Sequence, residues 1–174
     1  MKMIKFFSFT LLFGTLLALG AINANAQTTA PSSQFGIGAF AGGNVTSGGF
    51  QLQYAITPSV QIGLALGIFG ASRDGNSSTD YSTDIYGRFI FEGVVNPFVQ
   101  AGFRRVSEEI GSTTGTTVTS DNNQIYGAFG LEYFFNRNVG VYAAFDVLAL
   151  NLDPSATFFG ANNGRVGVEW YFSP

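Results

Sequence analysis

Arginines and acidic residues recur at alternating positions in five segments of the chain, and the chemistry that such residues support is ion pairing. Each has the sequence parity opposite to the large apolar residues around it, so all of them share one face of their strands. Charges on an enclosed face need partners, because desolvating an unpaired charge is costly. We therefore predict a network in which arginines bridge the acids. Its expected members are Asp84, Arg88, Glu92, Arg104, Glu132, Asp146, Arg165 and Glu169.

Histidine and cysteine are both absent, which limits the other chemistry the chain could perform. A serine nucleophile has no histidine to activate it, and a metal ion lacks its commonest ligand. A carboxylate pair could act as acid and base, but ion pairing with arginine explains Glu132, Asp146 and Glu169 better. No phosphate loop or nucleotide fingerprint occurs. The sequence predicts no enzyme, no cofactor, and no catalytic or metal site.

Residues 1–26 have the pattern of a secretory signal peptide. Lys2 and Lys5 precede an apolar run over residues 6–21, and residues 24–26 supply the small-x-small cleavage pattern before Gln27. The alternative is an anchor helix, but the apolar run is shorter than the ~20 residues of a membrane span. We expect one mature domain, residues 27–174.

The mature chain is acidic and contains no lysine. Removing Lys2 and Lys5 leaves six arginines against 11 acidic residues, a net charge of −5. This balance argues against a nucleic-acid partner, which would need clustered basic residues. Glycine (23 residues) and phenylalanine (19 residues) are abundant, which favours β-structure with aromatic outer surfaces.

Apolar and small or polar residues alternate in segments of about ten, the period of β-strands. The clearest segment places Val60, Ile62 and Leu64 on one face and Gln61 on the other. Eight strands are expected near residues 35–43, 48–57, 60–70, 81–92, 97–107, 124–135, 139–150 and 164–172.

The connections alternate between short turns and long polar loops, so the two ends of the sheet face different surroundings. Transmembrane barrels show this asymmetry, with short periplasmic turns and longer external loops. The expected turns are 57–59, 93–96 and 136–138, and the expected loops are 43–47, 71–80, 108–123 and 151–163.

A soluble barrel would also show alternating strands, so the composition of each face decides which one points outward. A water-facing surface normally carries many Lys, Glu and Asp residues. Here the face opposite the Val, Ile, Leu and Phe residues is mainly Gly, Ala and Gln. We therefore predict that the apolar face meets lipid and that small residues fill a narrow lumen. Aromatic residues near strand ends would form interfacial girdles, although any single one could be ordinary packing. The expected girdle residues are Tyr54, Tyr81, Tyr133, Phe135, Trp170 and Phe172.

Three stretches carry a resemblance to a known family: residues 96–102, residues 127–150 and the aromatic ending at 167–172. They resemble the small outer-membrane β-barrel proteins of the OmpA/OmpX-like group. The resemblance implies an all-β, eight-stranded antiparallel up-and-down transmembrane barrel, with both termini in the periplasm of a Gram-negative bacterium. It also implies outer-membrane lipid as surroundings and insertion by the outer-membrane assembly machinery.

The predicted function is structural or surface-interacting, with a lumen closed by the ion-pair network. A surface partner would be contacted through the loops 71–80, 108–123 and 151–163. The alternative is a narrow pore or a carrier for a small apolar ligand. Charged loop residues that could make surface contacts are Arg73, Asp74, Glu108, Glu109 and Asp121.

Overall fold

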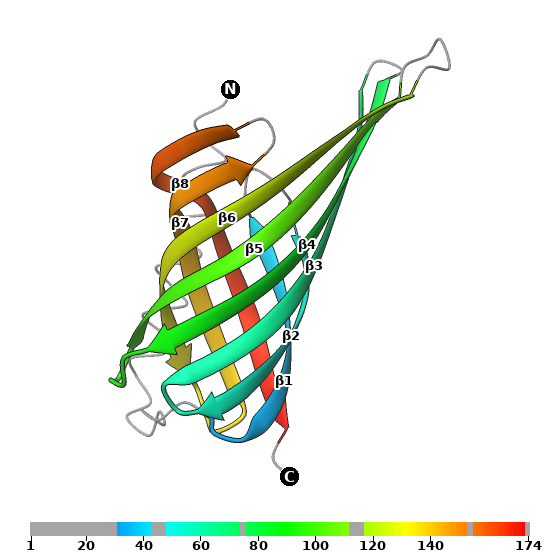
Figure 1. Cartoon of the computed structure of the whole chain (residues 1–174). Coiled ribbons are helices and arrows are strands. Elements are labelled where there is room, and N and C mark those ends of the chain that lie inside the picture. The colour runs from blue at the N-terminus through cyan, green and yellow to red at the C-terminus, as the bar shows by residue number, and fades with distance from the viewer. Residues whose placement is uncertain (1–30, 43–47, 74–75, 112–116, 153–154, 173–174) are drawn as a thin grey trace, which may run out of the picture.

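The computed structural model is a closed antiparallel β-barrel in which each strand pairs with the next and the last pairs with the first (Figure 1). The structure describes residues 31–42, 48–73, 76–111, 117–152 and 155–172. The predicted signal peptide and the expected loop 43–47 lie outside these residues. The strands are β1 (Gln34–Gly42), β2 (Gly48–Thr57), β3 (Val60–Arg73), β4 (Asn76–Ile90), β5 (Asn96–Gly111), β6 (Thr117–Phe134), β7 (Val139–Leu152) and β8 (Ser155–Phe172).

The strand alternation sorts side chains between an apolar outer wall and a polar lumen. On β2, Phe50 and Leu52 are exposed on the wall, whereas Gln51 and Gln53 are buried inside. Closure of the sheet through the β1–β8 pairing gives every barrel strand two hydrogen-bonded neighbours. This satisfies the backbone without a helix, as a hydrocarbon environment requires.

Aromatic rings fill much of the lumen, and each one lies over a glycine on the neighbouring strand. The absence of a Cβ lets the ring approach the backbone, so large and small residues interdigitate within the narrow interior. A Cβ added at Gly63, for example, would overlap the ring of Tyr86. The directly paired positions are Gly36–Tyr171, Gly49–Phe40, Gly63–Tyr86, Gly102–Tyr126, Gly130–Phe98, Gly140–Phe134 and Gly167–Tyr142.

Strands β3 to β6 extend well beyond the rest of the barrel, as the green arm in Figure 1 shows. The pairing of β2 with β3 stops at Gly67, and that of β6 with β7 starts at Gln124. Beyond these points the four strands pair only among themselves within the described residues. We call this part the protruding sheet; it comprises residues 68–73, 76–81, 105–111 and 117–123.

The protruding sheet corrects the expected loops 71–80 and 108–123, most of whose residues are strand. The expected loop 151–163 is likewise mainly the end of β7 and the start of β8. The physical reason is that ladder hydrogen bonds join backbone groups, whereas hydrophobic alternation reports only where one face is apolar. These segments are rich in Ser, Thr, Asn and Asp, so the strands show no hydrophobic alternation in the sequence.

At the opposite end the connections are short, as expected. Residues 58–59, 91–95 and 135–138 connect β2 to β3, β4 to β5 and β6 to β7. The hydrogen bond from Phe135 N–H to the Val139 carbonyl, at 2.9 Å, closes one of these turns. Among the described residues, no helix has the length and apolarity to span a membrane.

Candidate functional site: the polar lumen

Arg88 on β4 is the centre of one cluster, which we call the Arg88 network. Its Nη1 donates to Glu169 Oε1 at 2.7 Å and lies 3.8 Å from Glu132 Oε1. Its Nε donates to Gln100 Oε1 at 2.9 Å. The Arg88 side chain is only 1 % exposed, so protein groups, and not bulk water, stabilise its charge. Charge-assisted hydrogen bonds of this length are the strong kind.

Uncharged side chains complete the coordination of Glu169. Gln53 Nε2 and the Tyr171 hydroxyl both donate to Glu169 Oε2, at 2.5 and 2.9 Å. The Arg88 guanidinium also lies against the rings of Phe98 and Tyr142, with its central carbon 4.6 Å from each centroid. The ring faces attract the buried cation and exclude water from it.

A second cluster, which we call the Asp84 network, lies further along the lumen toward the protruding sheet. Asp84 Oδ2 is 3.5 Å from Arg104 Nη2 and 3.4 Å from Arg165 Nη1. The Tyr126 hydroxyl donates to the same carboxylate at 2.8 Å. Arg104 Nη1 donates in turn to Asp146 Oδ2 at 2.9 Å. Two arginines and two aspartates from four strands therefore join β4, β5, β7 and β8.

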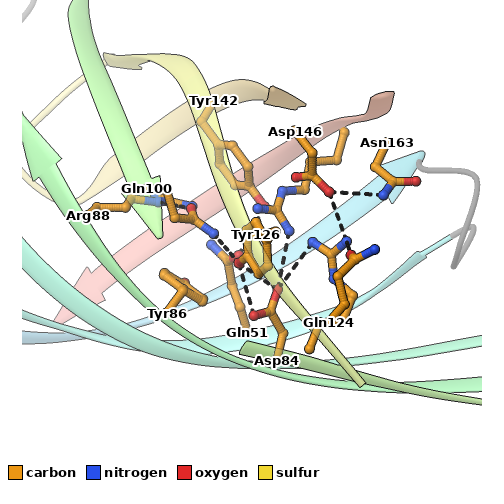
Figure 2. A network of polar contacts seen from close by, with 12 residues as sticks. Gln51, Asp84, Tyr86, Arg88, Gln100, Gln124, Tyr126, Tyr142, Asp146 and Asn163 are labelled. Carbon is orange, nitrogen blue, oxygen red and sulfur yellow. Dashed lines mark hydrogen bonds and ion pairs between the residues drawn. The ribbon is translucent and has the colours of Figure 1, made fainter. Parts of the chain in front are cut away.

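Gln100 connects the two networks through its amide group (Figure 2). Its oxygen accepts from Arg88, and its Nε2 donates at 2.6 Å to the Tyr126 hydroxyl, which donates to Asp84. A continuous chain of hydrogen bonds thus runs along the lumen between the two charge clusters. Such networks order the side chains of a core when their members are satisfied.

Several buried polar atoms have no hydrogen-bond partner among the described residues. Both carboxylate oxygens of Glu132 belong to this group, as do both side-chain polar atoms of Gln61 and Asp146 Oδ1. Arg165 likewise leaves its Nε and Nη2 unused. No described donor bonds to the oxygens of Glu132, unlike those of Glu169, and three arginines of the lumen face four carboxylates.

Seven of the eight residues that the sequence marked for the network line the lumen and take part in its ion pairs. Glu92 does not, which corrects that part of the prediction. Strand β4 ends at Ile90, and Glu92 is exposed in the turn that follows. The period-two count placed it on the inner face only because the strand was expected to run to residue 92.

The uncharged half of the site was not predicted from the sequence. Gln51, Gln53 and Gln100 are buried and hydrogen-bonded, and the lumen tyrosines bond to them or to the acids. The inner parity of these residues was a usable signal. Alternation alone assigns a face, however, and does not show which side chains on different strands meet across the lumen.

The aromatic residues predicted for girdles all lie on the wall, and most lie near the short turns. Trp170 and Phe172 stack at 6.0 Å, Tyr133 and Phe135 meet edge to face at 5.3 Å, and Tyr54 packs on Phe35 at 4.7 Å. Tyr81 instead lies at the base of the protruding sheet, where it pairs with Ile68 and Ser107.

Most charged residues described in the protruding sheet are exposed, in contrast to those of the lumen, and Asp80 is half-buried. Arg105 Nη2 donates to Asp121 Oδ2 at 3.1 Å, and the Ser107 hydroxyl donates to the other carboxylate oxygen. These two donors hold the pKa of Asp121 below its usual value. Glu108 and Glu109 are exposed on β5. The backbone of Arg73 pairs with Asn76, and Asp74 lies outside the described residues.

Comparison with solved structures places this architecture among known proteins. The crystal structure of the N-terminal β-barrel domain of Pseudomonas aeruginosa OprF matches with a TM-score of 0.58 and 21 % identity, over 81 % of this chain and 98 % of that one. The chain has the fold of the small outer-membrane β-barrel proteins. Neisserial surface protein A (NspA) matches with a TM-score of 0.55 and 15 % identity, over the same shares. No protein-family model and no curated protein sequence matches.

The small-barrel fold determines what the lumen arrangement can do chemically. An eight-stranded barrel has an interior just wide enough for side chains. Here that space holds two ion-pair networks and seven aromatic rings, and the guanidinium carbons of Arg88 and Arg104 lie 4.2–4.6 Å from ring centroids. The arrangement joins opposite walls and fills the lumen. It is suited to closing and rigidifying a barrel.

Proposed function

We propose that the protein is a non-enzymatic outer-membrane barrel of a Gram-negative bacterium that contacts surface partners through its protruding sheet. In this proposal residues 1–26 are a cleaved signal peptide, and the assembly machinery inserts the remaining chain with both termini in the periplasm. The observation that carries the proposal is the combination of an apolar wall with a polar sheet that extends beyond it at one end.

The wall supports a position in lipid. Large apolar side chains such as Leu64, Ile85 and Val99 are about half exposed along the barrel, with Leu64 at 48 % and Ile85 at 58 %. Soluble monomers rarely present a contiguous apolar surface of that extent. All the charged residues described on the barrel strands between the turns and the protruding sheet point inward, whereas Arg105, at the base of the protruding sheet, is exposed. A lipid-facing wall explains both features.

The protruding sheet supports contact with a partner outside the membrane. It is rich in Ser, Thr, Asn and Asp, and its β6 edge over residues 117–123 has a paired neighbour, β5, on one side only within the described residues. An exposed edge presents backbone donors and acceptors to another chain. NspA, one of the proteins of like fold, is named a surface protein.

The closed lumen favours this role over a pore. Arg88, Glu169 and Tyr142 lie across the interior and are almost fully buried. Conduction would require parting a 2.7 Å ion pair together with its stacked rings. Planar-bilayer recording tests the point directly: the proposal predicts no steady conductance, and a stable open level would favour the narrow pore instead.

Two experiments test the proposal itself. Protein from washed outer membranes should run faster on a gel before boiling in detergent than after, whereas recovery in the soluble periplasm without a shift would contradict the membrane placement.

The surface role can be tested by deleting the protruding sheet. The strand register defines where to shorten the four strands, because Ile68, Tyr81, Ser107 and Asp121 share one row. Joining Gly67 to Ser82 and Val106 to Asn122 by short turns removes that row and the sheet beyond it. Cells producing this variant should lose the attachment that wild-type cells show, with unchanged gel mobility.

A further inference from the structure

A groove interrupts the outer wall where β8, β1 and β2 lie side by side. Its volume is about 410 Å³, within the range of roughly 300–1,000 Å³ of small-molecule sites. The floor is Ala39, whose direct neighbours across the sheet are the larger Val168 and Phe50. We call this feature the wall groove. Its remaining lining residues are Ile37, Gly38, Gln51, Leu52 and Trp170.

The lining is apolar throughout its exposed part. Gln51 contributes backbone only, since its side chain is buried and bonds to Gln53 and Tyr142 inside the barrel. Phe50 at 73 % and Trp170 at 56 % exposure form opposite rims. No charged side chain lines the groove, so it suits a hydrocarbon chain whose polar group lies elsewhere.

We propose that the wall groove seats an acyl chain of a phospholipid. This inference rests on the proposed membrane position and adds a defined lipid site to it. The groove begins one outward row above Phe35 and Phe172, which form part of the aromatic rim at the short-turn end. A chain lying in it would place its headgroup beside that rim, where amphipathic rings meet the interface. With the termini in the periplasm, this is the phospholipid side of the outer membrane.

The size of the groove argues against a second copy of the protein as occupant. A stable protein interface buries roughly 800 Å² per partner. The wall groove involves eight residues on three strands, and its form is concave, as suits a single chain of methylene groups. The larger residues on its rim would contact the sides of that chain.

Trp170 is the sole tryptophan, so its fluorescence reports on this groove alone. The experiment places the protein in phosphatidylcholine vesicles brominated midway along the acyl chain and measures quenching of Trp170. Ala39→Phe fills the floor, and Ala101→Phe is the matched control on β5, where another exposed alanine faces outward away from the groove. We expect quenching to fall by about half in Ala39→Phe, because the new ring takes the volume of the chain, and to be unchanged in Ala101→Phe.

Native mass spectrometry after detergent exchange supplies a second readout. The wild type and Ala101→Phe should retain a phospholipid mass that Ala39→Phe loses, with heat-shifted gel mobility in all three showing that they fold. Equal quenching and equal retention in all three would overturn the seated chain while leaving the membrane barrel intact. Retention of lipopolysaccharide in place of phospholipid would also overturn it. Absence of any quenching in the wild type would contradict the membrane position itself.

Discussion

The barrel body and the protruding sheet share one set of strands yet depend on different interactions. In the body, closure of the sheet, rings over glycines and buried ion pairs act together. In the protruding sheet, the described side chains are mostly polar. Both members of its Arg105–Asp121 ion pair are solvent-exposed, the Arg105 side chain to 58 % and the Asp121 side chain to 47 %. The difference teaches that strand continuity does not imply uniform stability. We expect the body to be the cooperative unit and the protruding sheet to open locally at lower free energy.

The largest expected effect comes from removing the central cation of the body. Arg88→Met leaves Glu169 and Glu132 buried without a counter-charge, which should lower the free energy of unfolding by about 3–5 kcal/mol. Urea titration in lipid vesicles, followed by Trp170 fluorescence, measures it. The matched change in the protruding sheet, Arg105→Met, should have a far smaller effect because water solvates its partner. Similar losses for both variants would refute the contrast between the regions.

The two acids beside Arg88 should respond unequally to neutralisation. Glu169→Gln weakens bonds from Arg88, Gln53 and Tyr171, at an expected cost of about 1.5–3 kcal/mol. Glu132→Gln should cost less, because no described donor bonds to either oxygen of Glu132. The same urea titration distinguishes them. If Glu132→Gln proved the more damaging change, Glu132 would be the principal partner of Arg88 and our assignment would be reversed.

Alanine substitutions at two glycines of β3 compare how tightly side chains pack in the barrel body and in the protruding sheet. Gly63→Ala should destabilise the body by about 1–3 kcal/mol, because a Cβ there overlaps the Tyr86 ring. Gly70→Ala lies on β3 within the protruding sheet, where the nearest atom to an added Cβ is 4.0 Å away. There the change should be neutral or slightly stabilising. Equal destabilisation would mean that the ring can move aside or that the sheet is more tightly packed than its exposure indicates.

The smallest effect concerns acid pH and is confined to the protruding sheet. The depressed pKa of Asp121 means that its bonds from Ser107 and Arg105 stabilise the folded form above the usual carboxyl pKa. They are lost as the pH falls through the lower folded value. A carboxyl-carbon NMR titration should show Asp121 titrating below the ordinary Asp pKa of about 3.9. In Ser107→Ala the titration should move upward, and an unmoved titration would contradict the role of Ser107.

The sequence predicted the number and facing of the barrel strands because alternation is strong where one face is apolar, and the resemblance to the small outer-membrane barrels implied their antiparallel direction. Val60, Ile62 and Leu64 against Gln61 is such a case. Strands lacking an apolar face gave no such signal. Thr119 and Asp121 therefore seemed part of a loop, although their backbones pair with Glu109 and Ser107.

The candidate site was predictable in its charges and less so in its connections. Parity placed Arg88 and Glu169 on one face, but their contact spans 81 residues in sequence and depends on barrel closure. Glu92 was misplaced because the end of β4 depends on the geometry of the following turn, which hydrophobic alternation does not report. The bridging role of Gln100 follows from its position between Arg88 and Tyr126, which only the folded register defines.

The most direct test of the central claim uses the absence of cysteine, which allows single cysteines to be introduced without background labelling. Glu109→Cys probes the protruding sheet, Arg137→Cys a short turn and Leu64→Cys the wall. With a membrane-impermeant maleimide on intact cells, we predict labelling at 109 alone. Labelling at 137 should appear after the outer membrane is permeabilised, and position 64 should stay protected until the protein is unfolded. Labelling at 137 but not at 109 in intact cells, or at 64 in the folded protein, would contradict the account.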